Sequence, residues 1–350
     1  MIPFFDIKIT EDMIDAANTA LRNEKLVLGE SVFKFEEEFA KYIGTKYAIS
    51  VNSGTSALQL SIMALDLEKN SNILTSTNSF ISSSNSILLA GHKPVLADIF
   101  SNTGNINPNS VNVKFNAIMP VHIYGNPCNM EEISSIAEDK HIPVIEDAAQ
   151  AHGATYKNQK VGKLGKIGCF SFYPTKNMTV GGDGGMVTTD DENIVKTIES
   201  LRDNGRITKT KHDKLGSTMR LNTISAAIGR VQLKFLDSYN KKRKKIANFY
   251  RKKLNFDCLL EETPHGVSVY HQIVIRHKQR DAIMKHLEKS NIGNMIHYPI
   301  PIHKQPLYSK YNLSLPESEL FCNEILSLPS FPLLADEQMK IIVEKVNEVI

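Results

Sequence analysis

The feature that most constrains the fold of this chain is a regular alternation of short apolar runs and amphipathic stretches between residues 45 and 190. The apolar runs have the length and composition of strands: KYAISV (46–51), SNILTS (71–76), KPVLADI (93–99), FNAIMPVHIYG (115–125) and IPVIEDAA (142–149). Between them stand stretches with helical spacing, such as NSGTSALQLSIMAL and NMEEISSIAEDKH. Strands that alternate with helices at this spacing predict an α/β fold, with a parallel sheet covered by helices on its faces.

The pattern changes after Gly185, where the chain becomes helical and then mixed. Residues 222–253 predict a long helical region. Further on, GVSVYHQIVIRH (266–277) alternates like a half-buried strand, and QRDAIMKHLEKSNI has the spacing of an amphipathic helix. We therefore expect two domains: a large domain that includes the N-terminal arm, residues 1–240, and a smaller α+β domain, residues 241–350.

Composition and charge argue against several classes of function. A net charge of +3 is too small to favour binding to nucleic acid or to an anionic membrane surface. No run reaches the roughly 18 apolar residues of a membrane span, and the N-terminus lacks the pattern of a signal peptide, so we expect a soluble cytoplasmic protein. The four cysteines have no spacing typical of a metal site, and we expect free thiols in a reducing compartment.

Two stretches are unusual in composition. KKRKKIANFYRKK (241–253) carries eight positive charges in thirteen residues, while Ile246, Phe249 and Tyr250 fall at helical spacing. We interpret it as a helix with a solvated basic face, and an anion-binding patch is the alternative. TSTNSFISSSNS (75–86) is unusually polar for the middle of a domain.

Three loops follow predicted strands, at the edge where open parallel sheets bind ligands. The first is VNSGTSAL (51–58), whose backbone amides and the hydroxyls of Thr55 and Ser56 could converge on one anion such as a phosphate. Helix capping by Ser53 or Thr55, with a tight turn at Gly54, explains the same residues equally well.

The second loop is IPVIEDAAQAHG (142–153), in which an apolar strand ends in Glu146 and Asp147 and is followed by Gln150 and His152. A carboxylate at this place must be paired, hydrogen-bonded or catalytic, because its burial is otherwise costly. Ribose-binding acids of dinucleotide-binding folds and metal-binding aspartates have a similar pattern. The dinucleotide interpretation is disfavoured, because no GxGxxG precedes the acid by about 20 residues.

The third loop is CFSFYPTKNMTVGGDGGMVTTD (169–190), which contains one lysine, Lys176. A lysine becomes a nucleophile when burial or a nearby positive charge lowers its pKa, and it then forms a Schiff base with an aldehyde. Pro174 would fix the turn, and the glycines permit a close approach of the backbone. An ordinary solvated loop lysine is the alternative.

Together the loops contain the parts that pyridoxal phosphate (PLP) requires. These parts are an anion site, a carboxylate for the protonated pyridine nitrogen and a lysine for the Schiff base. Phe80 follows another predicted strand and could stack on the face of the ring. A core phenylalanine is the alternative interpretation of Phe80.

The chain resembles a known family over nearly its whole length. NSGTSAL, KPVLADI, PVHIYGNPCNMEEI, IPVIEDAAQAHGATY, GKIGCFSFYPTKNM and GGDGGMVTTDDE resemble, in this order, the sugar-nucleotide aminotransferases of the DegT/DnrJ family. The resemblance implies the aspartate aminotransferase (type I) fold of PLP-dependent transferases. That fold has a large domain with a mostly parallel seven-stranded sheet flanked by helices, and a smaller C-terminal α+β domain.

The resemblance also implies roles for individual residues. Lys176 would form the internal aldimine with PLP and later move protons, and Asp147 would pair with the pyridine nitrogen. Gln150 would lie against the ring hydroxyl, and Phe80 would stack on the ring. The phosphate would be held by Gly54, Thr55, Ser56 and Ser171.

Other implied contacts come from a neighbouring subunit and from the C-terminal part. A G-x-N-x-R stretch of the partner commonly adds a phosphate contact in this family, and it corresponds here to GSTMRL (216–221). Arg220 is retained, but Thr218 stands at the asparagine position, so its hydroxyl would have to replace the amide. Asp183 stands where many relatives have glutamate, and the sequence assigns it no role. Substrate binding would involve His297, Tyr298 and His303.

The implied activity is transamination, because relatives that dehydrate sugars carry histidine in place of Lys176. L-Glutamate would donate its amino group to PLP, and the pyridoxamine phosphate form would aminate a keto group of a nucleotide-linked sugar, in a homodimer with active sites at the subunit interface. TKNMT favours a 4-keto-6-deoxy sugar. A 3-keto nucleotide sugar, or a keto-cyclitol or aminoglycoside precursor, is the alternative substrate, and a non-catalytic PLP-binding regulator is the alternative class.

Overall fold

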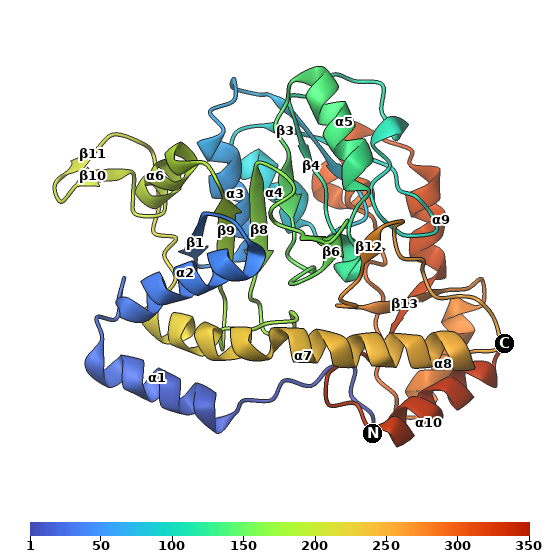
Figure 1. The fold of residues 1–350 in the computed structure, drawn as a ribbon. Coiled ribbons are helices and arrows are strands. Elements are labelled where there is room, and N and C mark those ends of the chain that lie inside the picture. The colour runs from blue at the N-terminus through green and yellow to red at the C-terminus, as the bar shows by residue number, and fades with distance from the viewer.

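A computed structural model describes residues 1–350, and a layer of strands runs through the large part of the molecule (Figure 1). The layer consists of a four-stranded sheet in the order β1-β9-β8-β5 and a three-stranded sheet in the order β3-β2-β4. The strands are β1 (Tyr47–Val51), β2 (Asn72–Ser76), β3 (Lys93–Ala97), β4 (Ala117–Met119), β5 (Ile145–Asp147), β8 (Ile167–Ser171) and β9 (Gly185–Thr189). All run in one direction except β9, which is antiparallel to both of its neighbours.

The two sheets meet between β4 and β5, where isolated parallel bridges replace a regular ladder. One of these bridges pairs Val121 with Asp147. The ladder is incomplete because Pro120 and Pro143 have no N–H group to donate, and each only accepts a hydrogen bond through its carbonyl oxygen. The α/β fold is therefore confirmed, whereas the expected continuous seven-stranded sheet is present only in part.

Helices cover both faces of the strand layer, because successive strand residues point to opposite sides. Cys169 of β8, for example, lies in the apolar cluster of one face and Phe170 in that of the other. The first face is covered by α3 (Gly54–Ala64), α4 (Ser82–Leu89) and α6 (Glu192–Leu201). The opposite face is covered by α2 (Glu30–Ile43), α5 (Met130–Lys140) and α7 (Thr223–Lys253), and α1 (Glu11–Asn23) packs on α7.

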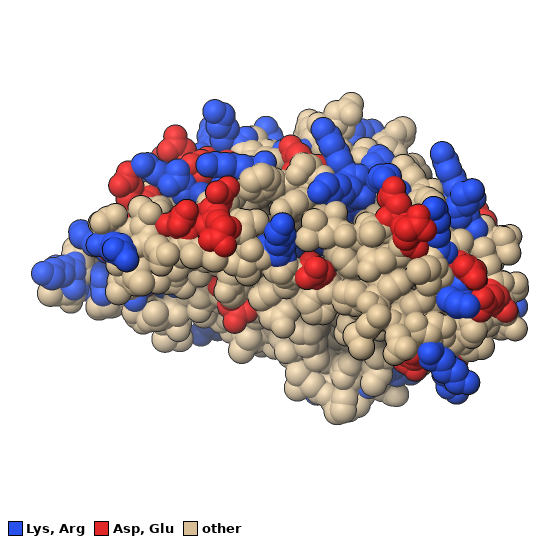
Figure 2. Space-filling model, turned by 90° about the horizontal axis from the view of Figure 1, so that it is seen from below, with Lys and Arg blue, Asp and Glu red and all other residues tan.

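Helix α7 confirms the long helical region expected over residues 222–253, and it is 31 residues long. Its basic residues Lys241, Lys242, Lys245, Arg251, Lys252 and Lys253 are exposed, as expected of a solvated face. Lys244 is half-buried, and Arg243 is buried. On the face seen in Figure 2, lysines and arginines lie among aspartates and glutamates rather than forming one basic field.

The C-terminal part has a core of its own. Its elements are β13 (Ile273–Arg276), α8 (Arg280–Lys289), α9 (Pro316–Glu324), β14 (Ile325–Leu328) and α10 (Asp336–Asn347). A cluster of 21 buried residues draws on β13, α8, β14 and α10, on the end of α7 and on Ile2. This cluster agrees with a smaller C-terminal domain, but the expected boundary at residue 240 lies inside α7 and stays a prediction.

The single strand expected over residues 266–277 is wrong. The chain forms β12 (Gly266–Val267) and then β13, and the residues between them leave the strand conformation. The N–H group of Val269 donates to the carbonyl of Gly125 at 3.0 Å. These residues thus bond to the loop after β4, and His271 is brought to the cavity described below.

The remaining elements are short. They are β6 (Thr155–Tyr156), β7 (Gln159–Lys160), β10 (Arg206–Thr208), β11 (Lys211–His212) and the 3-10 turns at Pro108–Ser110, Ile123–Gly125, Ile302–Lys304 and Pro306–Tyr311. The hairpin of β10 and β11 projects from the body of the molecule (Figure 1). The four cysteines are buried free thiols, as expected. No helix has both the length and the apolar character needed to cross a membrane.

Candidate active site

A cavity of about 430 Å³ lies at the carboxyl ends of β5 and β8. Loops that follow β1, β2, β5 and β8 form most of its wall, and two segments of the C-terminal part complete it. The cavity brings together the expected site residues Gly54, Thr55, Phe80, Asp147, Gln150, Ser171, Lys176, His297 and Tyr298. Asp183, to which the sequence assigned no role, also lines it. The size is that of a typical cofactor or substrate pocket.

Asp147 ends β5 and is 3% exposed. Its Oδ2 accepts a hydrogen bond from the Ser83 hydroxyl at 2.7 Å, and its Oδ1 accepts one from the Ala149 N–H at 3.2 Å. Burial raises the pKa of Asp147, while these two donors and the charge of Lys176 act in the opposite direction. The carboxylate is therefore held at the cavity wall by donors that favour its ionised form.

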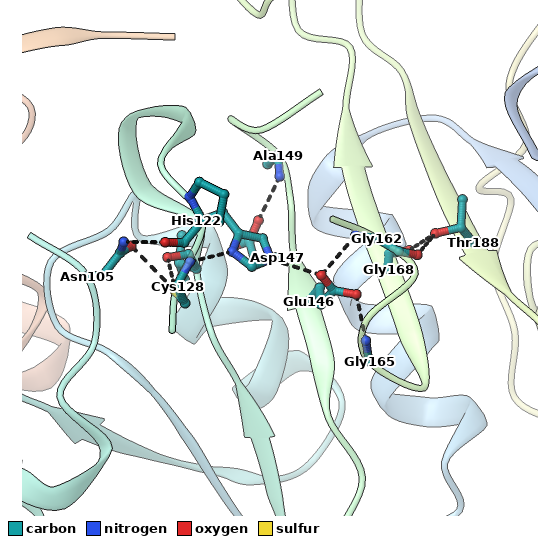
Figure 3. Close-up of polar contacts among 12 residues, drawn as sticks. Asn105, His122, Cys128, Glu146, Asp147, Ala149, Gly162, Gly165, Gly168 and Thr188 are labelled. Carbon is teal, nitrogen blue, oxygen red and sulfur yellow. Dashed lines mark hydrogen bonds and ion pairs between the residues drawn. The ribbon is translucent and has the colours of Figure 1, made fainter. Parts of the chain in front are cut away.

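Glu146 precedes Asp147 on the same strand but has different partners (Figure 3). It is fully buried and accepts hydrogen bonds from the N–H groups of Gly162 at 2.8 Å and Gly165 at 2.7 Å, and it lies 3.0 Å from His122 Nε2. The N–H of Cys128 donates to His122 Nδ1 at 3.0 Å, so the ring proton is on Nε2 and is donated to Glu146. Glu146 thus anchors β5 from behind the cavity.

Lys176 follows β8 in a turn closed by a hydrogen bond of 2.8 Å from its own N–H to the carbonyl of Tyr173. The side chain is half-buried, and its amine forms no hydrogen bond or ion pair with another residue. Desolvation lowers the pKa of Lys176 to about 8, although the charge of Asp147 acts to raise it. This environment differs from that of a solvated loop lysine, the alternative that the sequence left open.

His152, which follows the aspartate loop, is a buried neighbour of Lys176 rather than part of the cavity wall. Its ring lies 5.4 Å from that of Phe170 and 5.8 Å from that of Phe172, and neither ring nitrogen has a partner. Burial, together with the charge of Lys176, lowers the pKa of His152 to about 3. The imidazole is therefore neutral and adds no charge to the site.

The loop before α3 combines the two interpretations that its sequence allowed. Ser53 caps the helix, because its Oγ accepts the N–H of Ser56 at 3.0 Å. The amides of Gly54 and Thr55 come before the first intrahelical hydrogen bond and so are available to an anion. A Cβ atom at Gly54 would lie 2.6 Å from Cβ of Ser171, so only glycine permits this close approach of the two loops.

The aromatic side of the cavity is formed by Phe80 and Tyr298, whose ring centroids are 6.0 Å apart. Phe80 is 55% exposed, which excludes the interpretation as a core residue. Gln150 donates through Nε2 to the Tyr298 hydroxyl at 3.2 Å and accepts the Tyr124 N–H at 2.7 Å. His297 lies beside them, 2.9 Å from Ser327 Oγ, and burial lowers its pKa to about 4.

Four expected site residues do not line the cavity. The Ser56 hydroxyl turns back to Asn52 Oδ1 at 2.6 Å. Thr218 is exposed, Arg220 forms an ion pair with Asp203, and His303 lies between Thr77 and Glu319. Within one chain, nothing supports a cofactor or substrate contact by these four residues.

The cavity also contains residues that sequence reasoning missed. Ser79 and Ser83 belong to the polar stretch 75–86, whose composition was the available signal, and their hydroxyls lie 2.7 Å apart. His271 lay inside a presumed strand and gave no signal. Its Nδ1 lies 3.1 Å from Asn177 Oδ1, and burial, together with the charge of Lys176, keeps its pKa well below the ordinary value.

Comparison with known proteins relates the whole chain to an aminotransferase family. A model of the DegT/DnrJ/EryC1/StrS aminotransferase family matches residues 7–347. The chain is 39% identical over 359 residues to the dTDP-3-amino-3,6-dideoxy-α-D-galactopyranose transaminase of Aneurinibacillus thermoaerophilus, covering 99% of each protein. It is 32% identical over 362 residues to the dTDP-3-amino-3,4,6-trideoxy-α-D-glucose transaminase of Streptomyces venezuelae, covering 99% of this chain and 96% of the relative.

Solved structures agree with these relationships. The X-ray structure of S. venezuelae DesV in complex with a ketimine intermediate has a TM-score of 0.95 at 32% identity, covering 99% of this chain and 98% of the other. NtdA of Bacillus subtilis with bound cofactor PMP has a TM-score of 0.89 at 30% identity, covering 97% of this chain and 82% of the other.

Proposed function

The chain belongs to the DegT/DnrJ/EryC1/StrS aminotransferase family, and on this premise we propose that it transfers the amino group of L-glutamate to the C3 ketone of a nucleotide-linked deoxy sugar. It is a sugar aminotransferase, and PLP is its cofactor. The observation that carries the proposal is the placement of Lys176, with its lowered pKa, and the buried Asp147 on one cavity.

The residues of the cavity fit PLP at each of its polar groups. Asp147 offers a carboxylate for the ring nitrogen, and Phe80 offers an aromatic face. The amides of Gly54 and Thr55 and the hydroxyl of Ser171 suit the phosphate, since an anion is stabilised at a helix N-terminus. When bound, the cofactor supplies an electron sink and carries the amino group between the two substrates.

Lys176 has the properties of a proton-transfer group. With a pKa of about 8, a far larger fraction of its amine is neutral near neutral pH than in an ordinary lysine, so Nζ can accept a proton. We assign to Nζ both the attachment of the cofactor and the removal of the proton from the α-carbon of L-glutamate. In the second half of the cycle it returns a proton to the sugar carbon that receives the amino group.

Asp147 has an electrostatic task. Its two hydrogen-bond donors oppose the burial that raises its pKa, so the carboxylate can remain ionised and hold a proton on the ring nitrogen. Gln150 is kept in place by Tyr124 and Tyr298, and its side chain is positioned to contact the ring hydroxyl.

The position of the ketone is proposed from the relatives. Both curated relatives described above are named for products with the amino group on carbon 3 of a dTDP-linked deoxy sugar, and each is similar to this chain over nearly its full length. We therefore prefer the 3-keto alternative over the 4-keto-6-deoxy sugar that TKNMT favoured. The sugar would lie beside Tyr298 and His271, at the wall contributed by the C-terminal part.

We further propose a homodimer of type I fold with active sites at the subunit interface. Thr218 and Arg220 lie away from the cavity of their own chain, which supports a contact with the cofactor phosphate in the cavity of the neighbouring subunit. In that position the Thr218 hydroxyl would act in place of the more common asparagine.

The test is incubation of the PLP-loaded protein with L-glutamate and a panel of dTDP-, UDP- and GDP-linked 3-keto and 4-keto sugars. The amino product is identified by mass spectrometry and NMR. We expect amination at carbon 3 of a dTDP-linked deoxy sugar. A product aminated at carbon 4 would show that the proposed position of the ketone is wrong. If no nucleotide sugar is aminated, the proposed substrate class is refuted.

A further inference from the structure

Asn177 follows Lys176 directly in the chain and is 4% exposed. Its side-chain amide donates through Nδ2 to the carbonyl oxygen of Val269 at 3.1 Å and to Oδ1 of Asn240 at 2.9 Å. Its Oδ1 lies 3.1 Å from Nδ1 of His271. These contacts all reach segments that are distant in the sequence, and none of the proposed catalytic contacts uses them.

Asn240 of α7 continues the same row of hydrogen bonds. It is half-buried, and its Nδ2 donates to the carbonyl oxygen of His152 at 2.8 Å. His152 lies in the loop that follows Asp147, whereas Asn177 lies in the loop that follows β8. A Cβ atom at Gly153 would lie 3.0 Å from Nδ2 of Asn240, so glycine leaves room for this close contact. Asn240 thus joins the aspartate loop to the lysine loop.

Backbone carbonyls fix the orientation of both amides. Because a carbonyl oxygen only accepts hydrogen bonds, the NH₂ group of Asn240 must face His152, which leaves its oxygen for Asn177. By the same reasoning, the carbonyl of Val269 orients the NH₂ group of Asn177 and leaves the Asn177 oxygen for His271. An amide oxygen cannot donate, so the proton between Asn177 and His271 belongs to Nδ1 of the imidazole.

This chain of hydrogen bonds sets the protonation of His271. Burial, together with the charge of Lys176, keeps the pKa of His271 well below its ordinary value, so the ring is neutral and carries one proton. With that proton on Nδ1, the other nitrogen, Nε2, is an acceptor, and it lies 3.5 Å from Nε2 of Gln272. His271 and Gln272 both line the active-site cavity, which therefore receives no positive charge from this imidazole.

The chain also extends the connection between the two loops beyond the strands. The backbone pairing of β5 with β8 ends at the hydrogen bond of 2.8 Å from the N–H of Ala148 to the carbonyl of Cys169, and Lys176 lies further along. A lysine that attaches the cofactor needs a fixed position relative to the carboxylate that holds the ring nitrogen. A displacement of about 1 Å at a reacting group can lower a rate by about 100-fold.

We propose that Asn177 and Asn240 are positioning residues for transamination. Their hydrogen bonds hold Lys176 in place relative to the aspartate loop and keep the single ring proton of His271 on Nδ1. Neither asparagine lines the active-site cavity, so both act through residues that do. The inference rests on the proposed role of Lys176, but the first experiment below does not depend on that role.

The first experiment is neutron diffraction from crystals of the PLP-loaded enzyme grown in D₂O, which locates exchanged protons directly. We expect deuterium on Nδ1 of His271, directed at Oδ1 of Asn177, and none on Nε2. The ND₂ group of Asn177 should point to Asn240 and to the carbonyl of Val269. Deuterium on Nε2 of His271, or an Asn177 amide turned the other way, overturns the proposal. No substrate is added, so this result is independent of the proposed function.

The second experiment measures the reaction of the PLP-loaded enzyme with L-glutamate alone, followed through the absorbance of the bound cofactor in a single turnover. Asn177→Ala and Asn240→Ala should each lower the rate constant by about 10-fold, the scale set by one or two buried hydrogen bonds. The dissociation constant of L-glutamate should change much less, because neither asparagine lines the cavity. Asn255→Ala is the control, since this asparagine is exposed just after α7.

A lower melting temperature with an unchanged rate constant in both variants would show a purely structural role and refute the positioning. If Asn177→Ala does not fold, Asn240→Ala, at a half-buried position, supplies the measurement. If the wild type does not react with L-glutamate, the proposed amino donor is wrong. The fraction of PLP that borohydride fixes to Lys176 then tests the positioning, and an equal fraction in the wild type and both variants refutes it.

Discussion

The hydroxyl of Ser83 donates a hydrogen bond of 2.7 Å to Oδ2 of Asp147, and Ser79 Oγ lies 2.7 Å behind it. Ser83 is at the start of α4, and Asp147 ends β5, so the contact joins two segments that are 64 residues apart. Since burial raises the pKa of Asp147 and the Ser83 hydroxyl lowers it, Ser83 is a positioning residue that favours the ionised carboxylate.

Replacing Ser83 with alanine should weaken both cofactor binding and turnover. A hydrogen bond to a charged group contributes about 1.5–3 kcal/mol, so we expect turnover to fall by about 10-fold or more and the dissociation constant of PLP to rise. Ser83→Thr, which keeps the hydroxyl, should recover much of both values. Ser84→Ala is the control, because its hydroxyl donates to the carbonyl of Ile81 and not to Asp147. Equal effects of the Ser83 and Ser84 variants would contradict the assignment.

Replacing Lys176 with alanine should abolish turnover and the covalent attachment of PLP while leaving non-covalent binding. Attachment should be lost because Lys176 is the lysine that lines the cavity. Non-covalent binding should remain because the substitution does not change the phosphate site before α3. Borohydride reduction followed by peptide mass spectrometry locates the attachment. Lys163→Ala, at an exposed lysine, should retain labelling at Lys176. Labelling of any other lysine in the wild type would remove Lys176 from its proposed role.

The lowered pKa of Lys176 predicts a pH dependence of stability in the cofactor-free protein. Between its folded pKa of about 8 and its ordinary value of 10.5, the unfolded chain binds more protons at this residue, so its contribution to stability rises with pH across that window. Below pH 8 the amine is charged in both the folded and the unfolded chain, so its burial lowers the free energy of unfolding by a constant amount. Lys176→Met should therefore be more stable than the wild type at pH 7.5, and the difference should shrink toward pH 10.5.

Urea unfolding at several pH values between 7.5 and 10.5 measures this difference directly. Other lysines and tyrosines titrate in the same range, but they are common to both proteins and cancel in the comparison. If the free energy of unfolding changes with pH in the same way in the wild type and in Lys176→Met, the amine is not desolvated.

Replacing Gly54 with alanine should destabilise the protein and weaken PLP binding, because the new Cβ would lie 2.6 Å from Cβ of Ser171. Overpacking of this kind costs about 1–3 kcal/mol and would move the first turn of α3 relative to β8. Gly182→Ala is a matched control, since no atom lies within 4 Å of its added Cβ. Denaturant unfolding and PLP titration give the two values. If both variants unfold at the same denaturant concentration, the close approach at Gly54 is not essential.

Much of the candidate site could be predicted because its parts lie at the ends of strands that run in the same direction in one sheet. Asp147, Lys176 and the loop around Gly54 each follow a readable apolar strand, and strands of this kind present their carboxyl ends at one edge. The chain's resemblance to a family supplied the expected partners of these residues. The same logic gave no information on His271, because the segment that contains it alternates like a strand but is bent away by its hydrogen bonds to the loop after β4.

Local pattern alone determined the α/β class, the long helix α7 and the identity of the residues at the strand ends, because each depends on side-chain periodicity within a short window. The tertiary structure alone decided the electrostatic state of those residues. The lowered pKa of Lys176, the Ser83 contact of Asp147 and the unpartnered Nε of Arg243 arise from the packing of segments that are distant in the sequence. Burial of a charge depends on everything packed around it, and a linear sequence does not state which segments those are.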